Sequence, residues 1–204
     1  MIANAFETVQ NFEKVIAEYS GCKYAVAVDS GSNALFLCCL YCNIRGSEVT
    51  IPSRTYPSVP CGIIHAGGKV KFKDCQWSGT YRLEPFPIVD GAKRFTSNMY
   101  EKETLHCLSF HAKKHLKIGR GGAILTDDQK AYEWLKVARF DGRHECNLRD
   151  DNITCLGWNF YMTPEQAARG LWLMMMMPEH NADLEEVPDY PDLSKVSAYM
   201  KEEQ

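Results

Sequence analysis

The stretch YAVAVDSGSNALFLCCLYCNI, residues 24–44, decides the fold. Its first five residues form an apolar run typical of a buried strand, and the small polar turn DSGS follows directly. The apolar run after that turn is long enough for a helix. A buried strand that passes through a tight turn into a helix is typical of a βαβ unit, so this stretch predicts an α/β protein.

The rest of the chain continues this alternation. Apolar spacing of about 3.6 residues predicts a helix over residues 6–19. Further strands are expected over 48–53, 69–75, 87–92, 104–110 and 122–128, and further helices over 33–44, 59–67, 129–140 and 163–177. Six strands interleaved with helices predict a three-layer α/β sandwich around a mostly parallel sheet. Residues 1–177 would form this domain, and the acidic, Pro-rich residues 178–204 an extended tail.

Composition excludes several classes of protein. The 204 residues suit one domain, and the net charge of −3 offers no basic field for nucleic acid. No apolar run is long enough to cross a membrane, and the N-terminus lacks the basic and apolar regions of a secretory signal. Nine cysteines, several within apparently buried segments, favour free thiols in a reducing compartment, so we expect a cytoplasmic protein.

A metal site is not expected. Cys39 and Cys42 share one face of the helix predicted over residues 33–44, but no second pair at metal-ligand spacing accompanies them. The cysteines of this run are better interpreted as small core residues.

Small polar and aromatic residues follow the first two predicted strands. Ligands of a parallel α/β sheet bind beyond the carboxyl ends of its strands. Ser32 and Asn33 stand at the start of a helix there, where backbone N–H groups and hydroxyls suit an anion such as phosphate, although they could equally cap the helix. Tyr56 follows the second strand and could stack on a ligand or serve in packing.

A carboxylate and a lysine follow two later strands. Asp90 ends an apolar run, where it could cap a turn or pair with a cationic ring nitrogen. Lys113 and Lys114 lie just beyond the strand that ends near Ser109. They could form a solvated turn, or one of them could be a buried amine nucleophile that forms a Schiff base. An anion cradle, a stacking aromatic, a carboxylate and a Schiff-base lysine are together the needs of pyridoxal 5'-phosphate.

The chain resembles the DegT/DnrJ/StrS family of sugar aminotransferases, which have the PLP-dependent transferase large-domain fold. Seven stretches carry the resemblance in one order across roughly residues 12–173: DSGSNALFL, IPSRTYPS, VDGAK, SFHAKKHL, GRGGAILTDD, RFDGRHE and GWNFYMTPEQAA.

By position, the resemblance implies roles for the ring end of the cofactor. Lys114 would be the Schiff-base lysine, and Lys113 would hold the place of a small hydroxyl residue. Asp90 would pair with the pyridinium nitrogen, which makes Lys114 and Asp90 the candidate catalytic residues. Tyr56 would stack on the ring.

The resemblance also implies the phosphate end and a partner. Ser32, Asn33 and Ser109 would line the phosphate. Asn159 would reach the phosphate of a neighbouring subunit, so the resemblance implies a homodimer with shared active sites, a nucleotide-sugar substrate and an amino-acid donor.

The chain departs from the family pattern in three places. Lys93 stands where members usually have a glutamine near the ring hydroxyl of the cofactor. A helix, a strand and a second helix of the family are missing before the strand that ends at Asp90. We therefore expect the strand that ends at Ser53 to pair directly with that strand, because unpaired buried backbone groups are rarely tolerated. The family's C-terminal domain is also expected to be absent.

These features are consistent with three functions. The first is a PLP-dependent aminotransferase that acts on a nucleotide-linked keto-sugar. The second is a catalytically silent binding or partner subunit, favoured by the missing domain that would close the site against water. The third, a sugar dehydratase, is disfavoured because family members of that kind usually lack the lysine that Lys114 matches.

Overall fold

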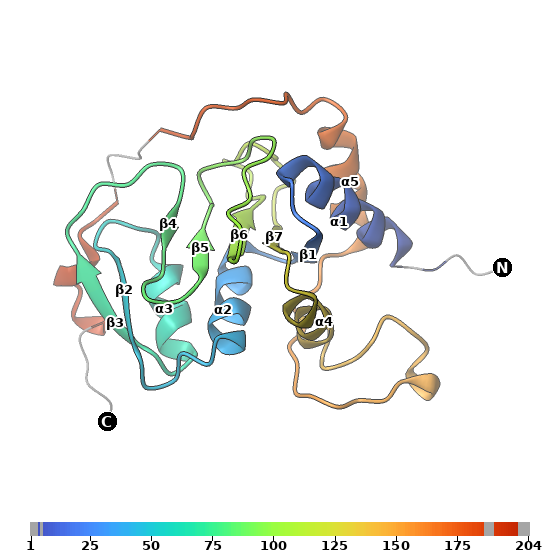
Figure 1. Ribbon diagram of the computed structural model, residues 1–204, viewed down its shortest axis with the longest axis horizontal. Helices are drawn as coiled ribbons and strands as arrows, with labels where there is room; N and C mark the ends of the chain where they lie inside the picture. The colour runs from blue at the N-terminus through green and yellow to red at the C-terminus, as the bar shows by residue number, and fades with distance from the viewer. Residues whose placement is uncertain (1–3, 5, 186–189, 200–204) are drawn as a thin grey trace.

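The computed structural model describes residues 4, 6–185 and 190–199, and two sheets form its centre (Figure 1). The main sheet has five strands in the order β1-β7-β6-β5-β4, and a smaller sheet pairs β2 with β3. The strands are β1 (Tyr24–Val28), β2 (Glu48–Pro52), β3 (Lys69–Lys73), β4 (Tyr81–Arg82), β5 (Ile88–Asp90), β6 (Leu105–Ser109) and β7 (Gly122–Thr126).

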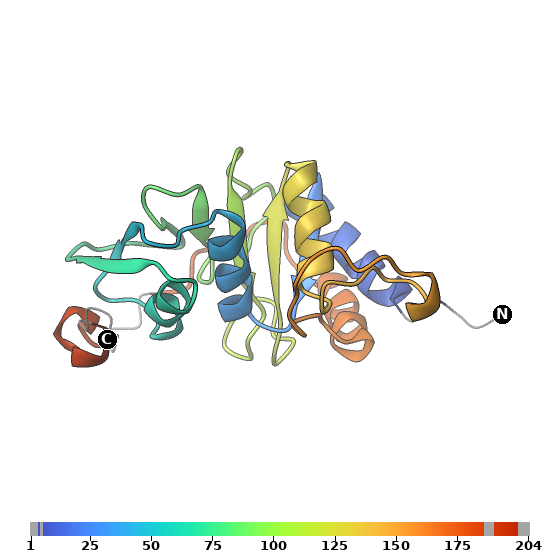
Figure 2. The same ribbon diagram turned by 90° about the horizontal axis from the view of Figure 1, so that it is seen from below.

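Helices cover both faces of the main sheet, so the expected three-layer α/β arrangement is present (Figures 1 and 2). One face carries α2 and α4, with α3 packed against α2 and β3, and the other carries α1 and α5. The helices are α1 (Glu7–Ser20), α2 (Gly31–Tyr41), α3 (Ser58–His65), α4 (Gln129–Ala138) and α5 (Pro164–Met174), with short 3-10 turns η1 (Leu148–Asp150), η2 (Leu193–Lys195) and η3 (Ser197–Tyr199).

The prediction of a mostly parallel, six-stranded sheet was wrong. The main sheet is mixed, because β5 and β6 are parallel whereas β1 and β7, β6 and β7, and β4 and β5 are antiparallel. The physical reason lies in the connection over residues 110–121, which contains no helix. The Phe110 N–H donates to the Gly121 carbonyl at 2.9 Å, so the chain turns back beside itself as antiparallel neighbours can.

The predicted pairing of the strand that ends at Ser53 with the strand that ends at Asp90 was also wrong. The short β4 lies beside β5, and the chain just after β4 bonds to β2. The Thr50 N–H donates to the Glu84 carbonyl at 2.8 Å, and the Glu84 N–H returns a bond to the Thr50 carbonyl at 3.1 Å. We call this junction of the two sheets the seam. Residues 81–84 thus pair the backbone groups that the missing family segment would have left open.

Capping explains where two helices begin. The Ser30 hydroxyl accepts a hydrogen bond from the Asn33 N–H at 3.2 Å and starts α2 beside the carboxyl end of β1. Thr163 caps α5 in a capping box with Gln166. This helix ends at Met174, three residues earlier than expected.

The core confirms the interpretation of the cysteines as packing residues. Cys38 and Cys39 of α2 are buried among the apolar side chains between α2 and the main sheet. In the part of the chain that the structure describes, no helix has the length and apolar character needed to cross a bilayer.

The described part of the predicted tail runs from α5 past the strand ends to the side of β3 (Figure 1). Asp183 forms a bidentate ion pair with Arg94 at 2.8 and 2.7 Å, and the Leu184 N–H donates to the Lys93 carbonyl at 2.9 Å. Further on, buried Leu193 donates its N–H to the Ser53 carbonyl at 2.9 Å. Residues 186–189 and 200–204 of the predicted tail lie outside the described residues.

Candidate active site

A cavity of about 560 Å³ opens at one edge of the main sheet. The strands β1, β5 and β6 all point their carboxyl ends to this edge, because β5 is parallel to β6 and β1 is antiparallel to β7. The residues that follow these strands line one side of the cavity, and residues 55–59, between β2 and α3, line the other. The cavity therefore lies at the edge where α/β sheets bind ligands.

The structure brings six of the eight candidate site residues into this cavity, namely Ser32, Tyr56, Asp90, Lys93, Ser109 and Lys114. Asn33 and Asn159 are not among the lining residues. The Asn33 amide donates to Asp29 at 2.7 Å, and the exposed Asn159 donates to Asp141 at 2.9 Å. Each of these amides is therefore held by a nearby carboxylate of the same chain.

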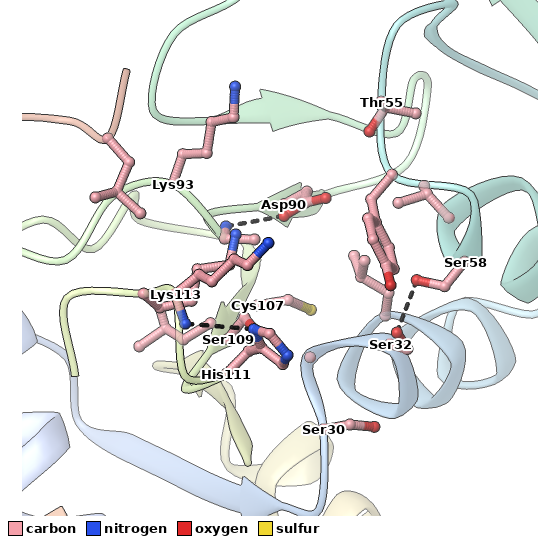
Figure 3. A pocket seen from close by; sticks show the side chains of 18 of the residues that line it. Ser30, Ser32, Thr55, Ser58, Asp90, Lys93, Cys107, Ser109, His111 and Lys113 are labelled. Carbon is pink, nitrogen blue, oxygen red and sulfur yellow. Dashed lines mark hydrogen bonds between the residues drawn. The ribbon is translucent and has the colours of Figure 1, made fainter. Parts of the chain in front are cut away.

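Hydroxyl groups gather at the start of α2 (Figure 3). The Ser32 hydroxyl donates to the Ser58 hydroxyl at 2.7 Å, and Ser30 and Ser109 line the same end of the cavity. A Cβ atom on Gly31 would lie 2.9 Å from the Ser109 Cβ, so only glycine lets the first turn of α2 approach β6 this closely. The first N–H groups of a helix have no acceptor within the helix, so this end of the cavity suits an anion.

Asp90 is a buried carboxylate on the wall, with a relative exposure of 4%. Its Oδ1 accepts the Ala92 N–H at 2.9 Å, and its Oδ2 accepts the Tyr81 hydroxyl at 2.8 Å. Burial raises the pKa of Asp90, while the two hydrogen bonds and the charges of Lys114 and Lys93 act to lower it. Asp90 is therefore a buried acidic group in a cavity that three lysines and Arg120 also line.

The loop after β6 carries both candidate lysines into the lining of the cavity. Lys113 is exposed, whereas Lys114 is half-buried. Burial lowers the pKa of Lys114, the nearby Asp90 carboxylate raises it, and Lys93 lowers it. Lys114 is thus the lysine of the pair whose surroundings favour a neutral amine.

Lys93 is the more deeply enclosed cation, with a relative exposure of 3%. Its Nζ lies 4.4 Å from the centre of the Trp77 ring and 5.1 Å from the centre of the Tyr190 ring. Tyr56, expected to stack on a ligand, lines the cavity from the opposite side and is 58% exposed.

Comparison with known proteins identifies the family. The family model described as the DegT/DnrJ/EryC1/StrS aminotransferase family matches residues 2–97 and 88–190 of the chain. The chain belongs to the DegT/DnrJ/EryC1/StrS aminotransferase family. Members of this family use pyridoxal phosphate and act in the biosynthesis of sugars and polysaccharides.

Individual relatives are distant. A transaminase of Campylobacter jejuni named for UDP-4-amino-4,6-dideoxy-N-acetyl-beta-L-altrosamine is 22% identical over 90% of this chain and 61% of its own length. GDP-perosamine synthase of Caulobacter vibrioides is 25% identical over 91% of this chain and 61% of its own. The chain therefore spans about three fifths of the length of these relatives.

Solved structures of the family share the fold. A DegT DnrJ EryC1 StrS aminotransferase from Brucella abortus superposes with a TM-score of 0.71 at 21% identity, over 84% of this chain and 59% of that one. The Helicobacter pylori aminotransferase involved in the biosynthesis of pseudoaminic acid gives a TM-score of 0.67 at 18% identity, over 84% and 58%.

Sequence reasoning missed several residues that the structure places in or beside this cavity. Thr55, Trp77 and Tyr190 line it, and Tyr81 bonds to its carboxylate. Trp77 and Tyr81 come from the irregular stretch after β3, and Tyr190 from the predicted tail. Three aromatic residues, Trp77, Tyr81 and Phe86, lie within residues 77–86, and this local enrichment is a signal that could have indicated packing there. Among the described residues, no cluster of three or more His, Cys, Asp or Glu side chains is placed to hold a metal ion.

Proposed function

We propose that this chain binds pyridoxal 5'-phosphate and transfers an amino group to a nucleotide-linked keto-sugar. The observation that supports this is the position of Lys114 and Asp90 in one cavity, with the N-terminus of α2 at its other end. An amine whose pKa is lowered, a buried carboxylate and an anion-binding helix end are the three groups that this cofactor needs from a protein.

The residues present fit the cofactor. Ser32, Ser109 and the first N–H groups of α2 would hold its phosphate. Asp90 would pair with its ring nitrogen, Tyr56 would cover one face of the ring, and Lys93 would lie at the edge where members of the family usually have a glutamine. When bound, pyridoxal phosphate supplies the electron sink that lets an amino group leave one carbon skeleton and join another.

The residues of this chain would bind the cofactor and transfer protons. The Lys114 amine would hold the cofactor and, as a neutral amine, would accept or donate a proton at the reacting carbon. Burial keeps this amine able to accept a proton, because it lowers the pKa of Lys114. The charges of Lys114 and Lys93 act to lower the pKa of Asp90 against the effect of burial, and as a carboxylate Asp90 would stabilise positive charge on the ring nitrogen.

The substrate class comes from the relatives. The transaminase of Campylobacter jejuni and the GDP-perosamine synthases carry UDP- and GDP-linked amino sugars in their names, and one Bacillus subtilis relative is named an aminotransferase for glutamate. We therefore propose a nucleotide-linked keto-sugar as acceptor and an amino acid, tested first as glutamate, as donor.

We also propose a homodimer with shared sites, in which Asn159 serves the partner's phosphate. Asn159 is exposed and lies outside the cavity of its own subunit, as this role requires. Trp172, Met175 and Met176 at the end of α5 supply an exposed apolar surface.

Spectroscopy and peptide mapping test the cofactor and its lysine. The purified chain, mixed with pyridoxal phosphate, should develop absorbance near the visible edge, and borohydride should fix the cofactor to Lys114. Lys114→Ala should abolish the label, whereas the matched Lys113→Ala should keep it. A label on Lys113, or none with excess cofactor, would overturn the proposal.

Activity then separates the two leading functions. Loaded protein that moves the amino group of glutamate to a UDP- or GDP-linked keto-sugar is an aminotransferase. Loaded protein that leaves both substrates unchanged fits the alternative of a catalytically silent partner subunit.

A further inference from the structure

We propose that Tyr81 is the positioning residue for Asp90, and that a hydrogen-bond chain from Thr55 through Tyr81 fixes the carboxylate that would face the cofactor's ring nitrogen. This inference rests on the proposed function, because it assigns Asp90 that partner.

The donor in each bond of the chain can be assigned. A carboxylate only accepts, so the Tyr81 hydroxyl donates to Asp90 Oδ2 at 2.8 Å. The one proton of Tyr81 is then used, so the Thr55 hydroxyl must donate to Tyr81 across their 2.6 Å contact. In Figure 3 the hydroxyl oxygen of Thr55 points towards Asp90.

Both ends of this hydrogen-bond chain, Thr55 and Asp90, are buried. Thr55 has a relative exposure of 1% and Asp90 of 4%, so water competes little for either group. The backbone aligns the middle of the chain, because Tyr81 of β4 pairs directly with Asp90 of β5. Trp77 packs edge-on against the Tyr81 ring, with ring centres 4.6 Å apart. These contacts therefore hold the Tyr81 hydroxyl in the position from which it donates to Asp90.

The source of Tyr81 makes the assignment specific to this chain. It lies in the short stretch that stands where the family resemblance implies a longer segment. That stretch closes the seam with its backbone at Glu84 and reaches the candidate active site with its side chain at Tyr81. Without the Tyr81 hydroxyl, the Ala92 N–H would remain as the donor to Asp90 among the hydrogen bonds of the described residues.

The consequence for Asp90 is electrostatic. Burial raises the pKa of this carboxyl, and the Tyr81 hydrogen bond acts in the opposite direction. The pKa of Tyr81 is itself raised well above its usual value, chiefly by burial, so the phenol remains a donor. Removing the hydroxyl should make the carboxylate easier to protonate and less able to hold a cationic ring nitrogen.

The test compares Tyr81→Phe with Tyr41→Phe. Tyr41 donates to Asp128 at 3.3 Å on an exposed surface, so its variant loses a bond of the same kind outside the site. The first measurement is the pKa of the Asp90 carboxyl in the cofactor-free protein, by carbon NMR of labelled aspartate, with Asp90→Asn to assign the signal. The second is the dissociation constant for pyridoxal phosphate.

We expect Tyr81→Phe to raise the pKa of Asp90 and to weaken pyridoxal phosphate binding about tenfold, the size of a hydrogen bond to a charged group. Tyr41→Phe should match the unmodified chain in both measurements. A folded Tyr81→Phe variant with an unchanged Asp90 pKa would overturn the inference.

Two other results would also test the inference. If Tyr81→Phe does not fold, Thr55→Val removes the donor that orients Tyr81, and a rise in the Asp90 pKa supports the chain while no change overturns it. If the unmodified chain takes up no cofactor, the proposed function fails, and the pKa measurement still decides whether Tyr81 controls Asp90.

Discussion

Asp90 and His106 are two buried polar side chains on adjacent strands, and they differ in their hydrogen bonding. Asp90 has two hydrogen bonds from this chain. His106 has no exposed surface, and neither of its ring nitrogens has a partner among the described residues. A Cβ on Gly91 would lie 2.4 Å from His106 Nε2, so the imidazole fits only because its neighbour is glycine. Burial lowers the pKa of His106 to about 4.

We predict that His106 makes the protein sensitive to acid. Between pH 6.5 and about 4 the unfolded chain binds a proton at this residue and the folded chain does not. The free energy of unfolding therefore falls by about 3 kcal/mol as the pH drops through this window, and changes little from this source above pH 6.5. Denaturant titrations at several pH values should show this loss reduced in His106→Leu.

The matched control is His65→Gln, at an exposed position of α3. Its pH profile should follow that of the unmodified chain. Parallel profiles for His106→Leu and the unmodified chain would show that the imidazole is not kept neutral.

Part of the candidate site could be predicted from single residues. Asp90 ends one strand and Lys114 follows another, and both apolar runs are visible in the sequence. Their position at the same edge of the sheet could therefore be inferred. Tyr81 and Thr55 could not, because their contact depends on which strands lie side by side. Strand order is a property of the folded sheet, and no local pattern around either residue encodes it.

At the scale of elements, the contact between α1 and α5 sets the second layer of the fold. Gly170 of α5 is the point of closest approach, since a Cβ there would lie 2.5 Å from Phe12 Cε2 and 2.9 Å from Ile118 Cδ1. Gly62 of α3 offers a contrast, because its nearest neighbour would be Phe36 Cβ at 3.9 Å.

We predict opposite effects for the same substitution at these two helical glycines. Gly170→Ala should lower the free energy of unfolding by about 1–3 kcal/mol, because the added methyl overpacks the helix contact. Gly62→Ala should raise it by up to about 1 kcal/mol, because alanine is the better helix former and there is room. Denaturant unfolding of both variants tests this, and a Gly170→Ala variant as stable as the unmodified chain would contradict it.

The types of element could be predicted better than their arrangement. Apolar spacing located five helices and six of the strands, since periodicity is a local property of the chain. The prediction of a mostly parallel sheet fails at β7, because the connection between β6 and β7 contains no helix that would carry the chain across the sheet. The two-residue β4 is too short to show a period at all.

At the scale of the whole molecule, the end of α5 carries a group of exposed apolar side chains. Trp172, Met175 and Met176 have relative exposures of 58%, 84% and 60%. Tryptophan and methionine are enriched where proteins meet, and lone apolar residues at these exposures would not need a partner. Three such side chains lie together in the last turn of α5 and the residues just after it, and this grouping favours the proposed homodimer.

We predict that the protein sediments as a dimer at micromolar concentration. Met175→Lys should shift it towards monomer, because a charge would be buried in the contact. Ile64→Lys, on the far side of the sheet in α3, should leave the dimer intact. A folded monomer that still binds pyridoxal phosphate would contradict the shared site and favour the silent-subunit alternative.

The seam between the two sheets has a mechanical consequence. Two backbone hydrogen bonds between Thr50 and Glu84 join parts that carry opposite walls of the cavity. The Thr55–Tyr81 hydrogen bond and a shared apolar core also join these parts, but an isolated pair of backbone bonds opens at a lower cost than a continuous ladder of strand hydrogen bonds. We therefore expect these two bonds to open more often than the hydrogen bonds between the strands inside either sheet. A ligand that touches both walls would act as a clasp, and the amide protons of Thr50 and Glu84 would exchange with solvent more slowly once it is bound.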